Sequence, residues 1–131
     1  MPYDEEKIKR VQEKSALPYK LGGWLGMPYE GDDGCLRFLH IAFAELGVSV
    51  NGRAPDLRKD ARLFREVDQP QFGDVAVFQH LPMSKYHVAM VLDWPFAAQC
   101  SRDTNGVSCI DVRREPWSRG LRSYWRFKEC S

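Results

Sequence analysis

The sequence has no large excess of charge of either sign and no long apolar run. Its 131 residues include 19 lysines and arginines against 18 aspartates and glutamates, so the formal net charge at pH 7 is +1. This balance excludes a protein that attracts nucleic acid or anionic lipid through its overall field. No stretch reaches the roughly 18 apolar residues of a membrane-spanning helix. We therefore expect neither nucleic acid nor a membrane as a partner.

The first residues also lack the apolar segment of a secretory signal. Residues 4–14 are mostly charged and good helix formers, so they predict a short amphipathic helix instead. We expect synthesis in the cytoplasm without a signal peptide, and in such a chain cysteines are expected to be thiols. Because the cysteines lack the close pairing of zinc sites, we expect no metal and no other cofactor. The four are Cys35, Cys100, Cys109 and Cys130.

Two longer helices are predicted in the first half of the chain. Apolar residues recur at helical spacing over 35–46, so a helix with one buried stripe is expected to begin at Cys35. A more exposed helix is predicted over 54–70, with Pro55 near its first turn. The apolar positions are Leu36, Leu39, Phe43 and Leu46 in the first helix, and Leu57, Phe64 and Val67 in the second.

The second half has the texture of short strands separated by turns. Asn105-Gly106 is the sharpest hairpin signal, and Cys100 and Cys109 flank it as candidate cross-strand neighbours. Helices followed by a β-meander over 74–128 predict an α+β fold with helices packed on one face of an antiparallel sheet of about five strands. Residues 1–131 are long enough for one such domain. The predicted strands are 74–79, 87–93, 96–101, 107–112 and 121–128.

Cys35 is the candidate nucleophile, because the partial positive charge of a helix N-terminus favours a thiolate. A catalytic thiol also needs an imidazole, and three histidines compete. His40 points away on the same helix, and His80 ends a strand. His87 begins the apolar strand HVAMVLD. From the residues alone, Cys35 is either a nucleophile or a buried structural thiol, and His87 either a base or a polar strand end.

Three segments in succession resemble the signatures of the NlpC-type peptidases, papain-like cysteine hydrolases of bacterial cell-wall peptides. The similarity extends from about Trp24 to Phe127 and is carried by GMPYEGDDGCLRFLHIAFAELGV, QPQFGDVAVF and YHVAMVLD. It implies a papain-like domain in which Cys35 attacks a peptide carbonyl and His87 is the base. The third member of that triad follows the histidine by about twelve residues, which is Gln99 here. Tyr29 matches a loop tyrosine beside the nucleophile and is implied to contact substrate.

The chain departs from that family at the nucleophile. The usual Asp-Cys-Ser-Gly is replaced by Gly34-Cys35-Leu36-Arg37, and Asp33 is the candidate for binding the free amine of a peptide. The leucine and the ending WSRGLRSYWRFK resemble the branch carried by tailed bacteriophages. The resemblance therefore implies a cysteine endopeptidase or amidase of peptidoglycan stem peptides. It also implies tail or baseplate proteins as partners, and a place in the virion tail with action in the periplasm or at the cell wall.

Two other functions remain open at the level of sequence. The altered nucleophile motif and Gln99 are compatible with a non-catalytic structural or assembly subunit of a phage tail tip that retains the fold. The stretch RREPWSRGLRSYWRFK interleaves five arginines with aromatic residues, a texture also found at nucleic-acid surfaces. A half-exposed terminal strand explains the same alternation.

Overall fold

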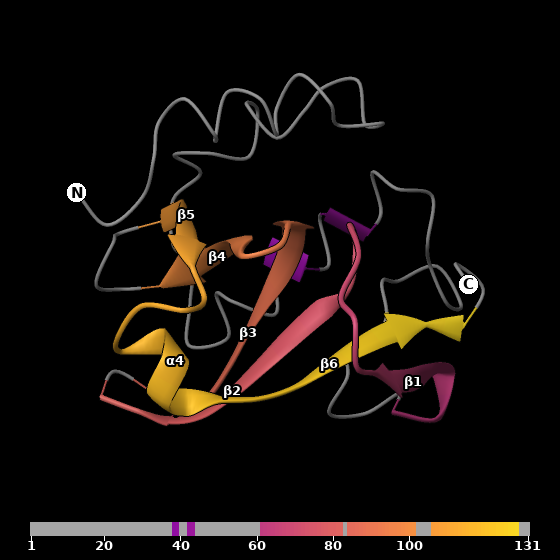
Figure 1. Ribbon diagram of the computed structural model, residues 1–131, viewed down its shortest axis with the longest axis horizontal. Helices are drawn as coiled ribbons and strands as arrows, with labels where there is room; N and C mark the ends of the chain where they lie inside the picture. Colours follow the sequence, from indigo (N-terminus) through magenta and orange to yellow (C-terminus); the bar gives the residue numbers. More distant parts are fainter. Residues whose placement is uncertain (1–37, 40–41, 44–60, 83, 102–105, 129–131) are drawn as a thin grey trace.

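The computed structural model describes residues 38–39, 42–43, 61–82, 84–101 and 106–128. Most of them form one six-stranded sheet in the order β1-β6-β2-β3-β4-β5 (Figure 1), in which every neighbouring pair is antiparallel. No helix in these ranges is long and apolar enough to cross a membrane. The elements are η1 (Ala61–Leu63), β1 (Phe64–Val67), β2 (Val75–Leu81), β3 (Ser84–Asp93), β4 (Phe96–Ser101), β5 (Gly106–Asp111), α4 (Trp117–Gly120) and β6 (Leu121–Phe127).

Period-two alternation along the strands divides the core into two clusters, one on each face of the sheet. On β2, Val75 and Val77 face the first cluster, whereas Ala76 and Phe78 face the second. Four helical residues within the predicted helix 35–46 pack into the first cluster, and the bounds of that helix lie outside the described residues. These buried helical residues are Phe38, Leu39, Ala42 and Phe43. The predicted helix 4–14 lies outside the described residues.

The sheet has six strands where about five were predicted, because the predicted helix over 54–70 was wrong at its end. Residues Phe64–Val67 form β1, and Phe64 lies opposite Phe127 of β6. The two rings meet edge to face, with centroids 5.6 Å apart. A four-residue strand is too short for its alternation to be recognised. The apolar spacing, which also suits a helix, therefore led to the wrong prediction. Burial of one aromatic ring against a distant partner decides the conformation.

The connection to the last strand also differs from a simple meander. Strands β2 to β5 follow one another across the sheet, but β6 returns to pair with β2 on its other side. The short helix α4, which the sequence did not predict, precedes this return. Its Trp117 packs on the second face, so the described helical residues contact both faces of the sheet rather than one. Gly120 permits the close approach, because a Cβ there would collide with Leu81.

A buried ion pair joins the start of β2 to the end of β6. Arg126 donates from Nε and Nη2 to the two oxygens of Asp74, both at 2.8 Å. Asp74 is 2% exposed and also accepts from the backbone N–H of Gln71 at 2.7 Å. Gly73, with φ of 91°, makes the turn that presents this carboxylate. The pair thus connects two strands whose ends are 52 residues apart in the chain.

Replacing Asp74 with asparagine is expected to lower the free energy of unfolding by about 3 kcal/mol, because it leaves the largely buried Arg126 guanidinium without its counter-ion. The matched control is Glu115→Gln, which breaks the exposed Arg119–Glu115 pair and is expected to cost about 0.5 kcal/mol. Urea unfolding of the three proteins measures both differences. Equal losses in the two variants would contradict the structural role of Asp74.

Candidate active site

Two residues that the sequence predicted as catalytic meet on neighbouring strands. His87 of β3 and Gln99 of β4 lie with Nε2 and Oε1 2.9 Å apart. Their side chains are removed from water, since His87 is 3% exposed and Gln99 is 0% exposed. Both lie in a core where a polar group without a partner is destabilising, so the hydrogen bond between them is the arrangement that burial requires.

The chemistry of Gln99 determines where the imidazole carries its proton. An amide carbonyl oxygen only accepts hydrogen bonds, so Nε2 of His87 is the protonated nitrogen when Oε1 faces it. In the neutral ring, Nδ1 then has the free lone pair. Nδ1 of His87 is therefore the nitrogen that can act as a base, while the hydrogen bond from Nε2 to Gln99 orients the ring.

Aromatic packing keeps this imidazole neutral. The ring centroid of His87 lies 5.6 Å from Trp117 of α4 and 6.0 Å from Phe78 of β2. Burial lowers the pKa of His87 from 6.5 to about 4, and the hydrogen bond with Gln99 opposes that shift only in part. At neutral pH the ring is therefore uncharged.

A third polar side chain extends the pair. Nε2 of Gln99 donates to Oγ of Ser108 at 2.7 Å, and Ser108 lies directly opposite Gln99 in the β4–β5 register. The result is a row from His87 through Gln99 to Ser108. It crosses β3, β4 and β5, which are adjacent in the sheet (Figure 1). In each of these two contacts a hydrogen-bond donor faces an acceptor.

The other predicted site residues lie outside the described part of the chain. Cys35, Tyr29 and Asp33 are in that group, so their roles stay predictions. Within the described ranges, no group of three or more His, Cys, Asp or Glu side chains is placed to hold a metal ion.

Two of the remaining cysteines are poor candidates for a nucleophile. Cys100 and Cys109 are buried, and neither is part of a disulfide bond. They are not directly opposite, because Cys100 pairs with Val107 and Cys109 with Ala98. Burial, aided by the charge of Asp111, raises the pKa of Cys109 to about 12. The Cys109 thiol is therefore protonated and unreactive at neutral pH.

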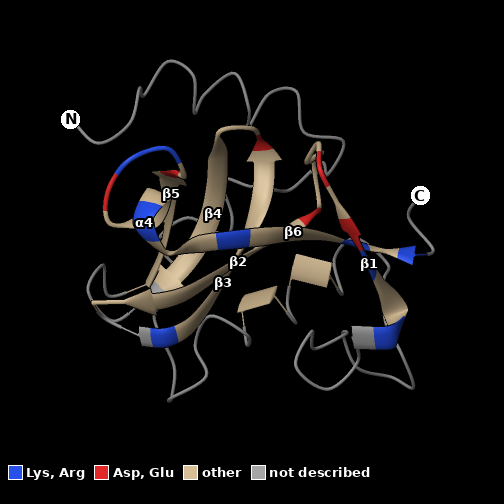
Figure 2. Cartoon of the chain, turned by 60° about the horizontal axis from the view of Figure 1, so that its bottom comes forward, with Lys and Arg blue, Asp and Glu red and all other residues tan. Residues whose placement is uncertain are grey.

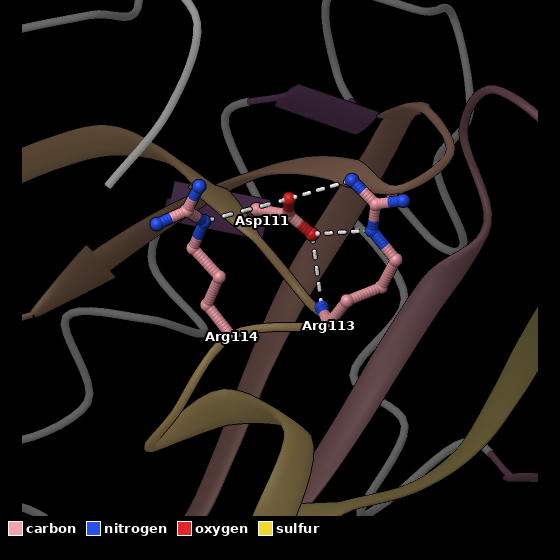
Figure 3. Close-up of polar contacts among 3 residues, drawn as sticks. All are labelled: Asp111, Arg113 and Arg114. Carbon is pink, nitrogen blue, oxygen red and sulfur yellow. Dashed lines mark hydrogen bonds and ion pairs between the residues drawn. The ribbon is translucent and has the colours of Figure 1, made fainter. Parts of the chain in front are cut away.

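The arginine side chains of the stretch RREPWSRGLRSYWRFK contact other residues of the same chain. Arg113 donates through its backbone N–H, Nε and Nη2 to the carboxylate of Asp111, and Arg114 lies 3.9 Å from the same group (Figure 3). Arg119 and Arg126 bind acidic side chains as described above. Figure 2 shows basic segments on separate elements, with acidic segments among them. Four of the five arginines of this stretch therefore form ion pairs at several places, and Arg122 donates to the backbone carbonyls of Arg119 and Leu121. These contacts agree with the half-exposed strand that explains the stretch without nucleic acid.

Sequence reasoning missed Ser108 and Trp117. The Asn105-Gly106 signal predicted a hairpin, and β4 and β5 do pair antiparallel, but the signal did not specify their register. In that register Gly106 lies opposite Ser101 and Ser108 opposite Gln99. Nothing in the sequence places Trp117 over His87, since α4 reaches the histidine only through the return of β6.

Solved structures with a similar fold are known. An NlpC/P60 family protein from Bacillus cereus superposes with a TM-score of 0.62 at 24% identity, over 79% of this chain and 36% of that one. The chain has an NlpC/P60-like fold. A lipoprotein-like NLP/P60 family protein from Staphylococcus aureus gives a TM-score of 0.60 at 19% identity, over 97% of this chain and 43% of the other.

A third similar structure has nearly the same length as this chain. It is the P60 domain of an antigen from M. avium subspecies paratuberculosis, with a TM-score of 0.53 and 26% identity over 92% of this chain and 90% of that one. The chain thus spans well under half of the first two NlpC/P60 structures and most of the third. No protein-family profile matches the sequence. No curated protein matches it either.

Proposed function

We propose that the protein is a cysteine endopeptidase of peptidoglycan stem peptides. The observation that carries the proposal is the buried hydrogen bond between His87 and Gln99, at the two positions that the family resemblance assigned to base and orienting residue. Two polar residues facing one another in a core are common, but a neutral imidazole with its Nδ1 lone pair free is what thiol catalysis requires. The NlpC/P60-like fold supports the same class of reaction and substrate.

In the proposed reaction, Cys35 is the nucleophile. Its thiol proton passes to Nδ1 of His87 as sulfur attacks the peptide carbonyl, giving a tetrahedral intermediate. The imidazolium then returns the proton to the leaving nitrogen, the C–N bond breaks, and a thioester remains on Cys35. Water, deprotonated by Nδ1 of His87, then hydrolyses the thioester to a carboxylic acid and regenerates the Cys35 thiol.

Gln99 and burial bear on the rate of these steps. A neutral amide orients the imidazole but stabilises imidazolium less than a carboxylate does. The lowered pKa of His87 also makes the imidazolium less stable. Proton transfer from Cys35 to His87 is therefore expected to be concerted with the attack of sulfur rather than to precede it. We therefore expect slow cleavage. We expect it to be selective as well, because the residues that bind the free amine in the family are replaced here while the nucleophile and base positions are retained.

The substrate side of the proposal uses Tyr29 and Asp33. Tyr29 is proposed to contact the peptide next to Cys35. Asp33 is proposed to bind the free amine of the peptide, in place of the family's aspartate and serine, which this chain lacks beside Cys35. We further propose that the protein acts in the periplasm or at the cell wall as part of a bacteriophage tail, with tail or baseplate proteins as partners. The ending WSRGLRSYWRFK and the leucine after Cys35 support this branch.

Incubation with purified muropeptides is expected to release new amine termini, detected by amine labelling and mass spectrometry. Cys35→Ser should remove this activity while the thermal unfolding temperature is retained, because oxygen is close to sulfur in size but a weaker nucleophile here. Cys109→Ser is the matched control and should retain cleavage, since its thiol is protonated. Intact muropeptides across a broad panel of peptidoglycan types, with a folded wild type, would favour the structural tail subunit instead.

A further inference from the structure

We propose that Trp117 and Gly120 are positioning residues of this site: Gly120 lets α4 lie close against β2, and Trp117 then keeps water from the His87 imidazole. Their part in turnover rests on the proposed function, whereas their effect on the imidazole does not. Both residues belong to the single turn of α4, and neither takes part in the reaction proposed above. In this proposal α4 covers the histidine as well as connecting β5 to β6.

Three rings pack against one another at the imidazole. The centroid of Trp117 lies 5.6 Å from that of His87 and 5.7 Å from that of Phe78, and the centroids of Phe78 and His87 are 6.0 Å apart. Phe78 lies opposite His87 in the β2–β3 register, so the sheet itself provides this ring. His87 and Phe78 are almost completely buried, whereas Trp117 is only half-buried. Trp117 is therefore the ring of this cluster that separates the imidazole from solvent.

The place of Trp117 depends on how closely α4 approaches β2 (Figure 1). A Cβ on Gly120 would collide with the side chain of Leu81 and lie 3.1 Å from the carbonyl oxygen of Gln79. That oxygen belongs to the backbone of β2 and cannot turn aside as a flexible side chain can. The backbone N–H of Gly120 donates to the carbonyl of Pro116 at 3.3 Å, so Gly120 and Trp117 share one hydrogen-bonded turn. A side chain at position 120 is therefore expected to push this turn, and Trp117 with it, away from β2.

Exclusion of water determines how readily the imidazole takes up a proton. Burial lowers the pKa of His87 from 6.5 to about 4, and the hydrogen bond with Gln99 opposes this shift. An indole also attracts an imidazolium beside it, which raises a pKa by about one unit, whereas complete burial lowers it by several. The loss of the Trp117 ring is therefore expected to raise the pKa of His87, because water can then solvate the charged form.

Charged groups on the surrounding elements do not account for the shift. Among the described residues, burial and Gln99 are the two influences on the pKa of His87, and no charged side chain contributes. On α4, Arg119 pairs with the exposed Glu115 at 2.8 Å. The other titratable side chains on the elements packed against the ring are His80 on β2, Lys85, Tyr86 and Asp93 on β3, and Cys100 on β4.

The test measures the pKa of His87 by NMR titration of protein labelled in its histidines, with the resonance identified by its loss in His87→Gln. Trp117→Ala is expected to raise this pKa by about one unit or more. Trp117→Phe should raise it less, because a phenyl ring still excludes water. Gly120→Ala should raise it as well, although it removes no ring from the cluster. The matched control is Ser118→Ala, an exposed position on the same turn, which should leave the pKa unchanged.

A further variant covers the case in which Gly120→Ala alone does not fold. Gly120→Ala combined with Leu81→Ala removes the side chain that a Cβ at position 120 would meet, and it should show the pKa of Leu81→Ala alone. An unchanged pKa in Trp117→Ala would overturn the role of Trp117. An unchanged pKa in folded Gly120→Ala, or a raised pKa in the double variant relative to Leu81→Ala, would overturn the role of Gly120.

Turnover of muropeptides provides the second readout. The acid limb of the kcat/KM profile reports the base of the free enzyme, so in Trp117→Ala it should move to higher pH by the same increment as the pKa of His87. A change in rate that is equal at every pH would indicate a merely structural role and would contradict the proposal. If the wild type cleaves no peptide, the proposed function fails, while the NMR titration still decides whether Trp117 and Gly120 keep water from the imidazole.

Discussion

Replacement of His87 by alanine is expected to slow cleavage of muropeptides at least ~100-fold. The imidazole is the group proposed to take the thiol proton of Cys35 and to protonate the leaving nitrogen, so it acts in both chemical steps. Its Nδ1 is available because Nε2 is bonded to Gln99 at 2.9 Å. The measurement is kcat/KM from the rate at which new amine termini appear. Thermal unfolding of the same sample establishes that the variant is folded.

The chain offers a matched control for this loss. His80 is exposed on β2 and has φ of 57°, a conformation that asparagine tolerates well. His80→Asn should therefore leave the rate unchanged. The cleavage rate of Gln99→Ala should lie between those of His80→Asn and His87→Ala, because an orienting group improves geometry without taking part in proton transfer. Should His87→Ala be destabilised, His87→Gln keeps a polar side chain near Gln99 and should be equally inactive. Undiminished activity in both His87 variants would contradict the assignment of the base.

Acidification from pH 7 to pH 4 is expected to cost the protein about 3 kcal/mol of stability through His87 alone. The pKa of His87 is lowered from 6.5 to about 4, mainly by burial, so the unfolded chain takes up this proton at a higher pH than the native protein does. The contribution is therefore present above pH 6.5 and is lost as the pH falls through that value toward the folded pKa. Phe78, Trp117 and Gln99 lie against the ring in the described part of the chain, and none of the three is ionisable in this range.

The measurement is the free energy of unfolding in urea at several pH values for the wild type and for His87→Gln. The difference between the two curves isolates the histidine from the carboxylates that also titrate in this range. His80→Asn again serves as the control, and its curve should follow that of the wild type. Parallel curves for the wild type and His87→Gln would show that His87 is not held neutral by the fold.

Local sequence patterns were sufficient for the four consecutive strands β2 to β5. Their predicted ranges lie within a few residues of the observed ones, and 96–101 coincides with β4. Each is recognisable because a strand with buried faces shows period-two alternation or a continuous apolar run between turn residues. The spacing from His87 to Gln99 was likewise available from the sequence, since the two residues are 12 apart on neighbouring strands.

Contacts between distant residues determined the remaining features. Phe64 lies in a strand because it pairs with Phe127, and Asp74 is buried because Arg126 reaches it from 52 residues away. In both pairs, the local sequence around one residue does not indicate which distant residue it contacts. The energy that selects β1 over a helix comes from burial in a sheet that exists only after β6 has returned to its place beside β2.

The site shows the same division. The sequence by itself determined a cysteine before an apolar helix, a histidine at the head of an apolar strand, and a glutamine at the spacing of an orienting residue. Only the tertiary structure decided that the His87 imidazole is buried and neutral, and that Ser108 faces the far end of Gln99. Residue types and spacings are local, whereas burial, register and the protonated nitrogen depend on which strands and rings surround a side chain after folding.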